Sequence, residues 1–408
     1  MIKCQSCGYA GLRTVVDLGR QPMCNRFLDK KSDFRKEKRY PLELVYCPNC
    51  SLVQLSYILP TSVTFDKNFN YLTATNPEIT RYFNRLGNEL RNKFRLSKDD
   101  YVVDIGSNDG TALVPFRNRN IRVLGVDPAP KPAAIANKNG IRTIVDSFEN
   151  SVERIIKITD GRIKLITAYN VLAHTHDINE FLDGIRDILK LNKDAVFVSQ
   201  SHYFVNLVDN CEFDTIYHEH ARYYTVTSLK NMFARHGLYI YRAERAKFYG
   251  GSILVYAGIR KPNATERKNI SKVISFEKKY TSKQAYARFA KTVEKKRKML
   301  REILMDMKTD GLRIVGIGAP MKSSTLLNYC SIDNTMLDYL TEVNRLKIGT
   351  YSPGAHIPVN DEKIIARDNP DAALILSWNL SDTIIKNMRK KGFKGKFIVP
   401  LPMPKVIG

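Results

Sequence analysis

The sequence has few cysteines, no long apolar run and a shortage of acidic residues. No apolar stretch approaches the roughly 20 residues that a membrane-spanning helix needs, and residues 1–4 lack the apolar core of a signal peptide. The 7 cysteines in 408 residues are too few and too clustered for a disulfide framework. We therefore expect a soluble, cytoplasmic protein from a reducing compartment.

The shortage of acidic residues leaves the chain strongly basic. The 41 Asp and Glu face 65 Lys and Arg, so the formal net charge is +24. Such a balance is typical of proteins that bind nucleic acid, an anionic membrane surface or phosphorylated small molecules. In residues 261–308, however, apolar side chains recur at helical spacing and predict an amphipathic helix or helix pair: Tyr286, Phe289, Ala290, Val293, Leu300, Ile303 and Leu304. We therefore interpret the charge as a solvated basic face and expect neither a nucleic-acid nor a membrane partner.

Two cysteine pairs mark the first of three regions, residues 1–70. Cys4-x-x-Cys7 and Cys47-x-x-Cys50 each place two thiolates on a tight knuckle, and two knuckles make a tetrahedral site suited to zinc. The competing interpretation is unrelated buried or redox-active cysteines. A closed site of four cysteines has no open coordination position, so it would stabilise the fold. The remaining cysteines are expected to be small core residues: Cys24, Cys211 and Cys330.

The second region, residues 71–260, alternates short apolar runs with helix-sized intervals. The runs at 101–105, 122–127, 144–146, 165–170 and 195–199 predict a parallel sheet flanked by helices. The segments 238–241 and 251–257 predict a closing pair of strands. In such sheets the ligand lies at the carboxyl ends of the strands.

A glycine loop follows the first of these strands. Gly106 and Gly110 allow close approach of backbone to a cofactor, and Asp127 is placed to accept from ribose hydroxyls. The loop lacks the dinucleotide fingerprint because Asn108 occupies its second glycine position. Asp104 suits a cationic cofactor better than a pyrophosphate. The pattern favours S-adenosylmethionine over a nicotinamide cofactor, and residues at later strand ends complete the predicted site: Asp146, Ser147 and Asn170.

The third region, residues 261–408, contains a second strand, glycine turn and helix start at 314–325. Lys322 and the free amides at the start of this helix would hold a diphosphate. The alternative is a turn that shapes the fold and binds nothing. We name Lys322 as the substrate-binding candidate of this region.

The run from Tyr217 to His220 contains most of the side-chain types that move protons near neutral pH. On an extended segment alternate residues face the same way. We therefore expect His218 and His220 on one face and Glu219 on the other, and we do not expect all four side chains in one pocket. A metal site on the two histidines is a further interpretation, but no third ligand is evident.

In this order the motifs resemble one family, the sugar C-methyltransferases that act on nucleotide-linked keto-deoxysugars. The resemblance covers almost the whole chain, and its markers are the four cysteines, 104–110, 170–174, 213–220, 250–252, 316–322 and 351–358. It implies an α/β protein with an N-terminal zinc-binding domain, a central class I methyltransferase domain with a Rossmann-like fold and a C-terminal Rossmann-like domain. The sugar nucleotide would lie between the last two domains, and we expect a monomer.

The resemblance also implies the roles of individual residues. A proton next to a carbonyl must be removed before a carbon becomes nucleophilic, and His220 would be the base. Tyr217 would hydrogen-bond the enolate oxygen, and Glu219 would orient or tune an imidazole. His174 and Tyr71 would complete the sugar pocket.

One departure from the family bears on the acceptor. The family usually has an acidic residue followed by Pro-Tyr or a similar pair at the end of the strand before the Tyr217–His220 run, where this chain has Gln200-Ser201-His202-Tyr203. A different sugar, a different carbon, or methyl transfer to oxygen or nitrogen of a related sugar or phosphorylated small molecule is the alternative. An RNA-binding or RNA-modifying zinc protein and a non-catalytic scaffold are the remaining hypotheses. The former would use aromatic residues of the basic segment to stack on bases.

Overall fold

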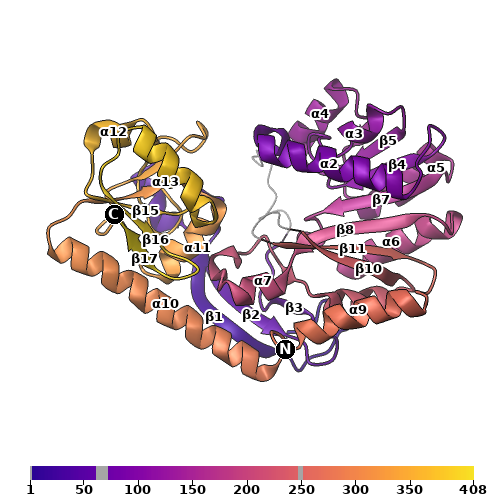
Figure 1. Ribbon diagram of the computed structural model, residues 1–408, viewed down its shortest axis with the longest axis horizontal. Helices are drawn as coiled ribbons and strands as arrows, with labels where there is room; N and C mark the ends of the chain where they lie inside the picture. Colours follow the sequence, from indigo (N-terminus) through magenta and orange to yellow (C-terminus); the bar gives the residue numbers. More distant parts are fainter. Residues whose placement is uncertain (1, 61–71, 247–250) are drawn as a thin grey trace.

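The computed structural model describes residues 2–60, 72–246 and 251–408, which form three β-sheets (Figure 1). The second and third sheets each lie in a separate lobe, which we call the second lobe and the third lobe after their sheets, and the first sheet lies between them. Tyr71 and Gly250, both named from the sequence, lie outside the described residues.

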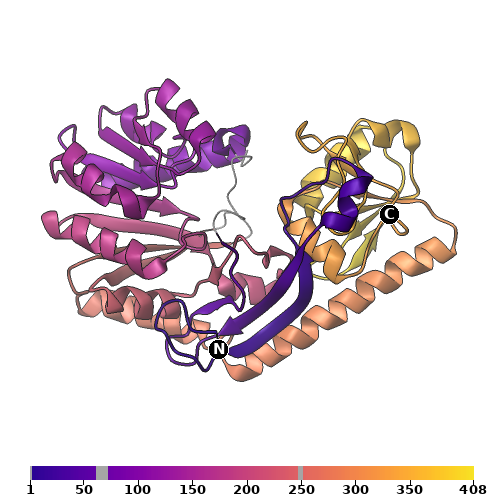
Figure 2. The same ribbon diagram turned by 180° about the vertical axis from the view of Figure 1, so that it is seen from behind.

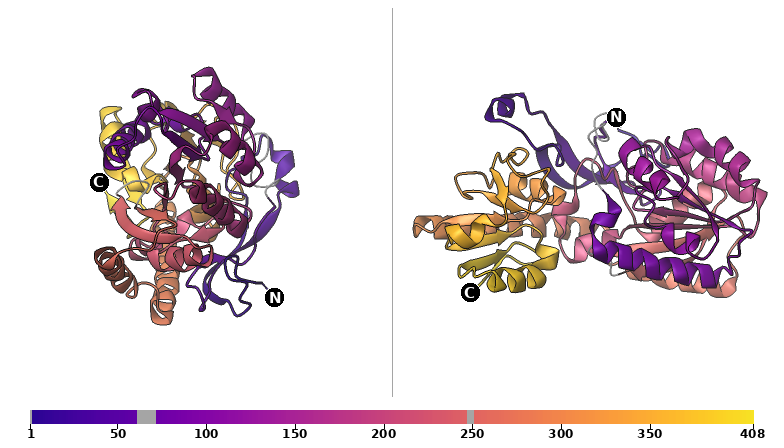
Figure 3. Two further views of the ribbon diagram at one scale, coloured as in Figure 1. Left: turned by 90° about the vertical axis from the view of Figure 1, so that its right-hand side faces the viewer. Right: turned by 90° about the horizontal axis from the view of Figure 1, so that it is seen from above.

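The first sheet is antiparallel, in the order β1-β2-β3-β9. β1 (Arg13–Pro22) and β2 (Arg39–Tyr46) form a long ribbon that runs along one side of the molecule (Figures 2 and 3). β3 (Val53–Leu55) follows, and β9 (Arg222–Tyr223) comes from a distant part of the chain. The ribbon buries one apolar face, as alternation along a strand requires: Val16, Leu18, Leu42 and Leu44.

The tip of this ribbon is bonded to the third lobe. It carries the 3-10 helix η1 (Lys31–Lys36). The Glu37 carboxylate accepts from the Gly354 amide at 2.9 Å and lies 2.8 Å from Nε2 of His356. The ring of Phe34 stacks on His356 with centroids 3.9 Å apart. The ribbon is therefore a brace between the lobes.

The second sheet has seven strands in the order β10-β11-β8-β7-β4-β5-β6. Its strands are β4 (Tyr101–Ile105), β5 (Arg122–Val126), β6 (Thr143–Ile144), β7 (Ile163–Tyr169), β8 (Val196–His202), β10 (Tyr239–Ala246) and β11 (Ser252–Gly258). The first five are parallel, while β11 pairs antiparallel with both β8 and β10. The predicted parallel sheet and its closing pair of strands are confirmed.

Helices cover both faces of this sheet, which is why its central strands are almost wholly apolar. They are α2 (Pro77–Lys93), α3 (Val114–Arg117), α4 (Pro130–Lys138), α5 (Phe148–Thr159), α6 (Ile178–Leu191) and α8 (Val226–Arg235). The start of α6 is typical: Asp177 caps it by accepting from the amides of Asn179 and Glu180. Its apolar face then packs into the core.

The third sheet has the order β14-β13-β12-β15-β16-β17. β12 (Ile314–Ile317), β13 (Leu340–Glu342), β14 (Val359–Asp361), β15 (Ala372–Ile375) and β16 (Lys396–Val399) are parallel, and β17 (Lys405–Ile407) is antiparallel. The helices are α11 (Met321–Tyr329), α12 (Ile364–Asp368) and α13 (Ser381–Lys390). The strand order reverses beside β12, which is where doubly wound sheets bind nucleotides. The predicted Rossmann-like third domain is confirmed.

The basic segment forms two helices, α9 (Ala264–Glu277) and α10 (Lys283–Thr309), as predicted. α10 runs beneath the molecule from the second lobe to the third (Figure 1). Tyr286, Phe289 and Val293 are buried in the core shared with the first and third sheets. The rings of Tyr286 and Phe289 therefore cannot stack on bases, whereas Phe276 of α9 is 43% exposed.

Two elements pack outside the predicted domain to which they belong in sequence; the predicted domains are 1–70, 71–260 and 261–408. β9 completes the first sheet although it lies in the second segment. α9 belongs to the third segment but packs on the second lobe, where Ile270 is buried. Among the described residues there is no helix that is both long and apolar enough to cross a membrane.

Candidate active site

The four paired cysteines come together at one end of the first sheet. Cys4 and Cys50 have their Sγ atoms 3.5 Å apart, those of Cys7 and Cys47 are 3.6 Å apart, and all four lie within 4.8 Å of one another. Zinc–sulfur bonds of about 2.3 Å in a tetrahedron place the sulfurs about 3.8 Å apart. The cluster therefore fits a zinc ion with four thiolate ligands and no open position.

The backbone around this cluster also fits the metal. Gly8 follows the first pair with a φ of +74°, and Ser51 follows the second with +65°. The Asn49 side chain donates to Sγ of Cys7 at 3.5 Å. Such donors to thiolates orient the ligands and disperse their charge.

The glycine loop of the second sheet turns directly after β4. Gly106 has a φ of +67°, and a Cβ there would lie 2.5 Å from a methyl group of Val171. Gly110 has a φ of +80°. The positive φ values and the lack of space explain the two glycines.

Asp127 holds this loop from the end of β5. Its two carboxylate oxygens accept from the amides of Asn108 and Ala129, each at 2.8 Å. Each oxygen keeps a further lone pair, so Asp127 can still accept from a ribose hydroxyl. The 3-10 helix η2 (Thr73–Thr75) bonds to the loop from the other side, because the amide of Thr73 donates to Oδ1 of Asn108 at 2.9 Å.

Two polar side chains at this loop lack a hydrogen-bond partner in the described part of the chain. Oδ1 of Asn170 and Oγ of Ser107 are buried and have no hydrogen-bond partner among the described residues. Asp104 is 2% exposed, accepts from Thr167 Oγ1 at 2.6 Å, and burial raises its pKa to about 7. Buried polar groups are seldom left unsatisfied, so this edge of the sheet fits a polar, cationic cofactor.

Two other predicted cofactor residues shape the next helix. Ser147 caps α5 by accepting from the Asn150 amide. Asp146 is exposed and accepts from the Ser147 amide at 2.7 Å. Both residues follow β6, at the same carboxyl edge of the second sheet as Asp104 and Asn170.

The run from Tyr217 to His220, which carries the candidate acid–base side chains, forms a turn. It follows α7 (Phe204–Asp209) and the 3-10 helix η3 (Phe213–Thr215), and the amide of His220 donates to the Tyr217 carbonyl at 3.0 Å. Tyr217 Oη lies 2.9 Å from Nε2 of His220, and Nδ1 of His220 lies 3.3 Å from the Thr215 carbonyl. A carbonyl only accepts, so Nδ1 carries the proton, and the lone pair of Nε2 accepts from the phenol.

Two further imidazoles surround His220. The ring of His174 lies 5.0 Å from it and that of His202 lies 5.2 Å from it, centroid to centroid. Burial lowers the pKa of His174 and of His202 to about 4 and holds that of His220 well below its ordinary value. All three are therefore neutral at pH 7, and His220 is available as a base.

The predicted arrangement of His218 and His220 on one face is wrong. The turn replaces the extended segment on which that prediction depended. Nε2 of His218 lies 3.2 Å from the Pro41 carbonyl, and its ring meets Tyr40 edge-on, 5.9 Å away. His218 therefore packs against β2, while His220 faces His174 and His202.

Glu219 contacts a cysteine. Sγ of Cys24, from the first sheet's segment, donates to Oε2 of Glu219 at 3.0 Å. Oε1 is buried without a hydrogen-bond partner among the described residues. Cys24 is buried as predicted, but it also positions a carboxylate next to the His220 turn, which the sequence did not indicate.

The third lobe reaches the same turn. Thr325 Oγ1 of α11 donates to the Ile216 carbonyl at 2.8 Å. Trp378, in η4 (Trp378–Leu380), donates to Oδ2 of Asp214 at 2.6 Å, and Nζ of Lys322 lies 3.7 Å from the same oxygen. Lys322 is therefore adjacent to the turn and is paired with a buried carboxylate.

Three comparisons with known proteins bear on this arrangement. Residues 4–65 match a family described as a zinc binding domain, residues 75–243 one described as a methyltransferase domain, and residues 247–402 one described as a C-methyltransferase C-terminal domain. C-methyltransferase NovU of Streptomyces niveus is 33% identical over 410 residues, which cover 99% of this chain and 96% of that protein. The chain belongs to the C-methyltransferase family.

Solved structures resemble this C-methyltransferase weakly. The PH0226 protein of Pyrococcus horikoshii is 12% identical, with a TM-score of 0.38 over 49% of this chain and 98% of that one. The magnesium protoporphyrin IX methyltransferase of Synechocystis, with bound S-adenosylmethionine, is 13% identical, with a TM-score of 0.32 over 44% of this chain and 79% of that one. Likenesses this low carry no functional information.

Membership of the C-methyltransferase family establishes the two cofactors of the chain. The C-methyltransferase uses S-adenosylmethionine, for which the glycine loop and its unpaired polar groups provide the fit, and its cysteine cluster is a zinc site. Sequence reasoning missed Cys24 and His202 as neighbours of the turn. The two unexpected residues Gln200 and His202 were the available signal, because they stand at the end of β8.

Proposed function

We propose that the C-methyltransferase acts on a carbon of a nucleotide-linked keto sugar, by way of an enolate, in branched-sugar or surface-polysaccharide biosynthesis. The observation that supports it most directly is the pairing of Tyr217 Oη with Nε2 of His220 at 2.9 Å, because a base and an oxyanion donor stand side by side. An enolate needs both at once. The resemblance to sugar C-methyltransferases supports the acceptor class.

His220 removes the proton in this proposal. Its Nδ1–H is held by the Thr215 carbonyl, so Nε2 offers the only free lone pair of the ring. The phenol of Tyr217 covers this lone pair in the described structure. When the substrate binds, the O–H turns to the substrate carbonyl oxygen, and Nε2 is free to take the proton from the adjacent carbon. The electron pair of the broken C–H bond passes into the enolate, whose oxygen accepts from Tyr217.

The cofactor supplies an electrophilic methyl group to this carbon. Gly106, Asn108, Gly110 and Asp127 would hold its nucleoside, with Asp146, Ser147 and Asn170 at the neighbouring strand ends. Asp104 would accept from its cationic amino group.

The sugar pocket combines residues from several elements. The unpaired Oε1 of Glu219 would accept from a sugar hydroxyl, since a buried oxygen without a partner is costly. His174 borders His220, and Lys322 of the third lobe, which is paired with Asp214, would contact the diphosphate of the substrate. Tyr71 stays part of the proposal and lies outside the described residues.

A second candidate is methyl transfer to oxygen or nitrogen of a related sugar or phosphorylated small molecule. Gln200 favours it, because this residue replaces the family's acidic group at the end of β8. Its Oε1 accepts from Tyr82 Oη at 2.7 Å, and its Nε2 is buried with no hydrogen-bond partner among the described residues. A neutral amide there suits a different polar group on the acceptor.

Incubation with S-adenosylmethionine and a panel of nucleotide-linked keto sugars tests the proposal. Mass spectrometry would register the added methyl group, and NMR would show a new carbon–carbon bond. A product methylated on oxygen or nitrogen would favour the second candidate, and no turnover across the panel would contradict both.

A further inference from the structure

The carbonyl of Thr215 decides which ring nitrogen of His220 carries the proton. Nδ1 of His220 lies 3.3 Å from this carbonyl oxygen, and Nε2 lies 2.9 Å from Tyr217 Oη. A phenol both donates and accepts, so Tyr217 is compatible with either neutral tautomer. A carbonyl only accepts, so the Thr215 carbonyl selects the tautomer with the proton on Nδ1 and the lone pair on Nε2. The position of one backbone carbonyl therefore determines whether His220 can take a proton at Nε2.

The third lobe bonds to the residues on both sides of Thr215. Before it, Oδ2 of Asp214 accepts from Nε1 of Trp378 at 2.6 Å. After it, the carbonyl of Ile216 accepts from Oγ1 of Thr325 at 2.8 Å. All four of these partners are buried, so water does not compete for the two bonds. The peptide that carries the selecting carbonyl is therefore held at both ends by donors of the third lobe.

Ring packing and charge add to these two bonds. The ring of Phe213 meets that of Tyr329 in α11 edge-on, with centroids 5.5 Å apart. Nζ of Lys322, in the same helix, lies 3.7 Å from Oδ2 of Asp214, so the ion pair gives the third lobe a second contact with this carboxylate. Three of the four residues at 213–216 therefore contact the third lobe, and the carbonyl of the fourth faces the imidazole.

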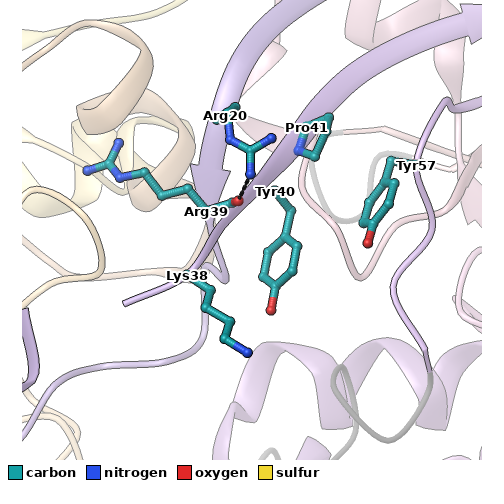
Figure 4. Close-up of a pocket in the computed structure, with 6 residues that line it drawn as sticks. All are labelled: Arg20, Lys38, Arg39, Tyr40, Pro41 and Tyr57. Atoms are coloured by element: carbon teal, nitrogen blue, oxygen red, sulfur yellow. Dashed lines mark hydrogen bonds between the residues drawn. The ribbon is translucent and has the colours of Figure 1, made fainter. Parts of the chain in front are cut away.

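The ribbon of the first sheet fixes the third lobe relative to the turn. The Arg39 side chain points away from Tyr57 and toward the third lobe (Figure 4), where it donates to the Gly354 carbonyl at 2.9 Å. Further along β2, the Pro41 carbonyl lies 3.2 Å from Nε2 of His218 in the turn. A donor can position its acceptor only if the donor itself is held in place. The ribbon provides this support, because it contacts both the third lobe and the turn.

We propose that the third lobe sets the tautomer of His220 by holding the Thr215 carbonyl. Asp214, Trp378 and Thr325 are then positioning residues, because they fix that carbonyl without contacting the reacting atoms. This inference rests on the proposed function in taking His220 as the base. It gives the third lobe a part in proton removal, besides its proposed part in substrate binding.

¹⁵N NMR of the His220 ring, whose signals are assigned by their loss in His220→Asn, tests the inference without substrate. The wild-type ring should carry its proton on Nδ1. Thr325→Val removes the hydroxyl donor at nearly constant volume, and Trp378→Phe removes the N–H donor and keeps an aromatic ring. Each should lower the ratio of the Nδ1–H to the Nε2–H tautomer by up to about fivefold, the usual contribution of one hydrogen bond.

Conservative and control variants separate this effect from a general loss of packing. Thr325→Ser keeps the hydroxyl and should keep the tautomer ratio. Thr159→Val is the matched control, because Thr159 is buried in α5 and its hydroxyl also donates to a backbone carbonyl at 2.8 Å. It should leave the His220 ring unchanged.

Proton exchange on a nucleotide-linked keto sugar in deuterium oxide gives a second readout. Thr325→Val should lower the exchange rate at saturating sugar about fivefold and leave KM unchanged, because its hydroxyl bonds to backbone and not to substrate. An unchanged tautomer ratio in both Thr325→Val and Trp378→Phe, even with a lower melting temperature, would overturn the inference. A shifted ratio in a protein that exchanges no keto sugar of the panel would support control of the tautomer and contradict the proposed function.

Discussion

The Cys24 thiol donates a hydrogen bond to the Glu219 carboxylate, with Sγ 3.0 Å from Oε2, and so joins the first sheet's segment to the turn that carries His220. Burial raises the pKa of both groups, so the thiol stays protonated and acts as a donor. The position of Oε1 of Glu219, which has no hydrogen-bond partner among the described residues, therefore depends on a residue almost 200 positions away in sequence.

Removal of this donor should affect activity. Cys24→Ala leaves a buried carboxylate oxygen unsatisfied, at a cost of about 1–3 kcal/mol. We expect a lower melting temperature and a higher KM for the sugar substrate. Cys24→Ser restores a donor and should recover most of both. Equal behaviour of the two variants in thermal unfolding and steady-state kinetics would show that the hydrogen bond does not position Glu219.

The cysteine cluster should carry one zinc ion per chain. Cys47→Ser removes one of the four ligands, so the zinc content per chain, measured by inductively coupled plasma mass spectrometry, should fall. The first sheet should also unfold at a lower temperature. Cys330→Ala removes a buried cysteine elsewhere and should keep the zinc. Loss of zinc from both variants, or its absence from the wild-type protein, would contradict the assignment.

Binding of S-adenosylmethionine should depend on pH through Asp104. Burial raises the pKa of this carboxyl to about 7 in the absence of cofactor, so it is protonated below pH 7 and must ionise to pair with a cation. Affinity should rise with pH between 6 and 8, by up to about tenfold per unit below pH 7. Isothermal titration should find this dependence removed in Asp104→Asn. A dependence that survives the substitution would exclude Asp104 as its cause.

As the pH falls, kcat/KM for the sugar substrate, measured at saturating cofactor, should decline only well below pH 6.5. Burial holds the pKa of His220 below its ordinary value, with contributions from His174 and His202. The neutral, basic form therefore persists as the pH falls through 6.5 and is lost only below it. A rate profile that falls with an apparent pKa at or above 6.5 would mean that His220 is not the base.

The fold was largely predictable because its signals are local. The apolar runs before Gly106 and Gly318 have the length and flanking glycines of buried strands, and the cysteine spacing indicates a metal. The pairing of β9 with β3, and the packing of α9 on the second lobe, are contacts across long stretches of sequence. No periodicity within a segment indicates which partner it will find.

The site was predictable only in part, for the same reason. The turn from Tyr217 to His220 could not be told from a strand by composition, so the face of His218 was predicted wrongly. Cys24 looked like a small core residue because its partner is far along the chain.

Proton exchange on the substrate tests the central claim most directly. A nucleotide-linked keto sugar is incubated in deuterium oxide without S-adenosylmethionine, and NMR follows the loss of the proton next to the carbonyl. We expect the wild-type protein to exchange it, and His220→Asn to slow the exchange about 10²- to 10⁴-fold. Tyr217→Phe should slow it by a similar factor of about 10²–10³, because the enolate oxygen loses its donor. Exchange at the wild-type rate in His220→Asn would contradict the assignment of His220 as the base.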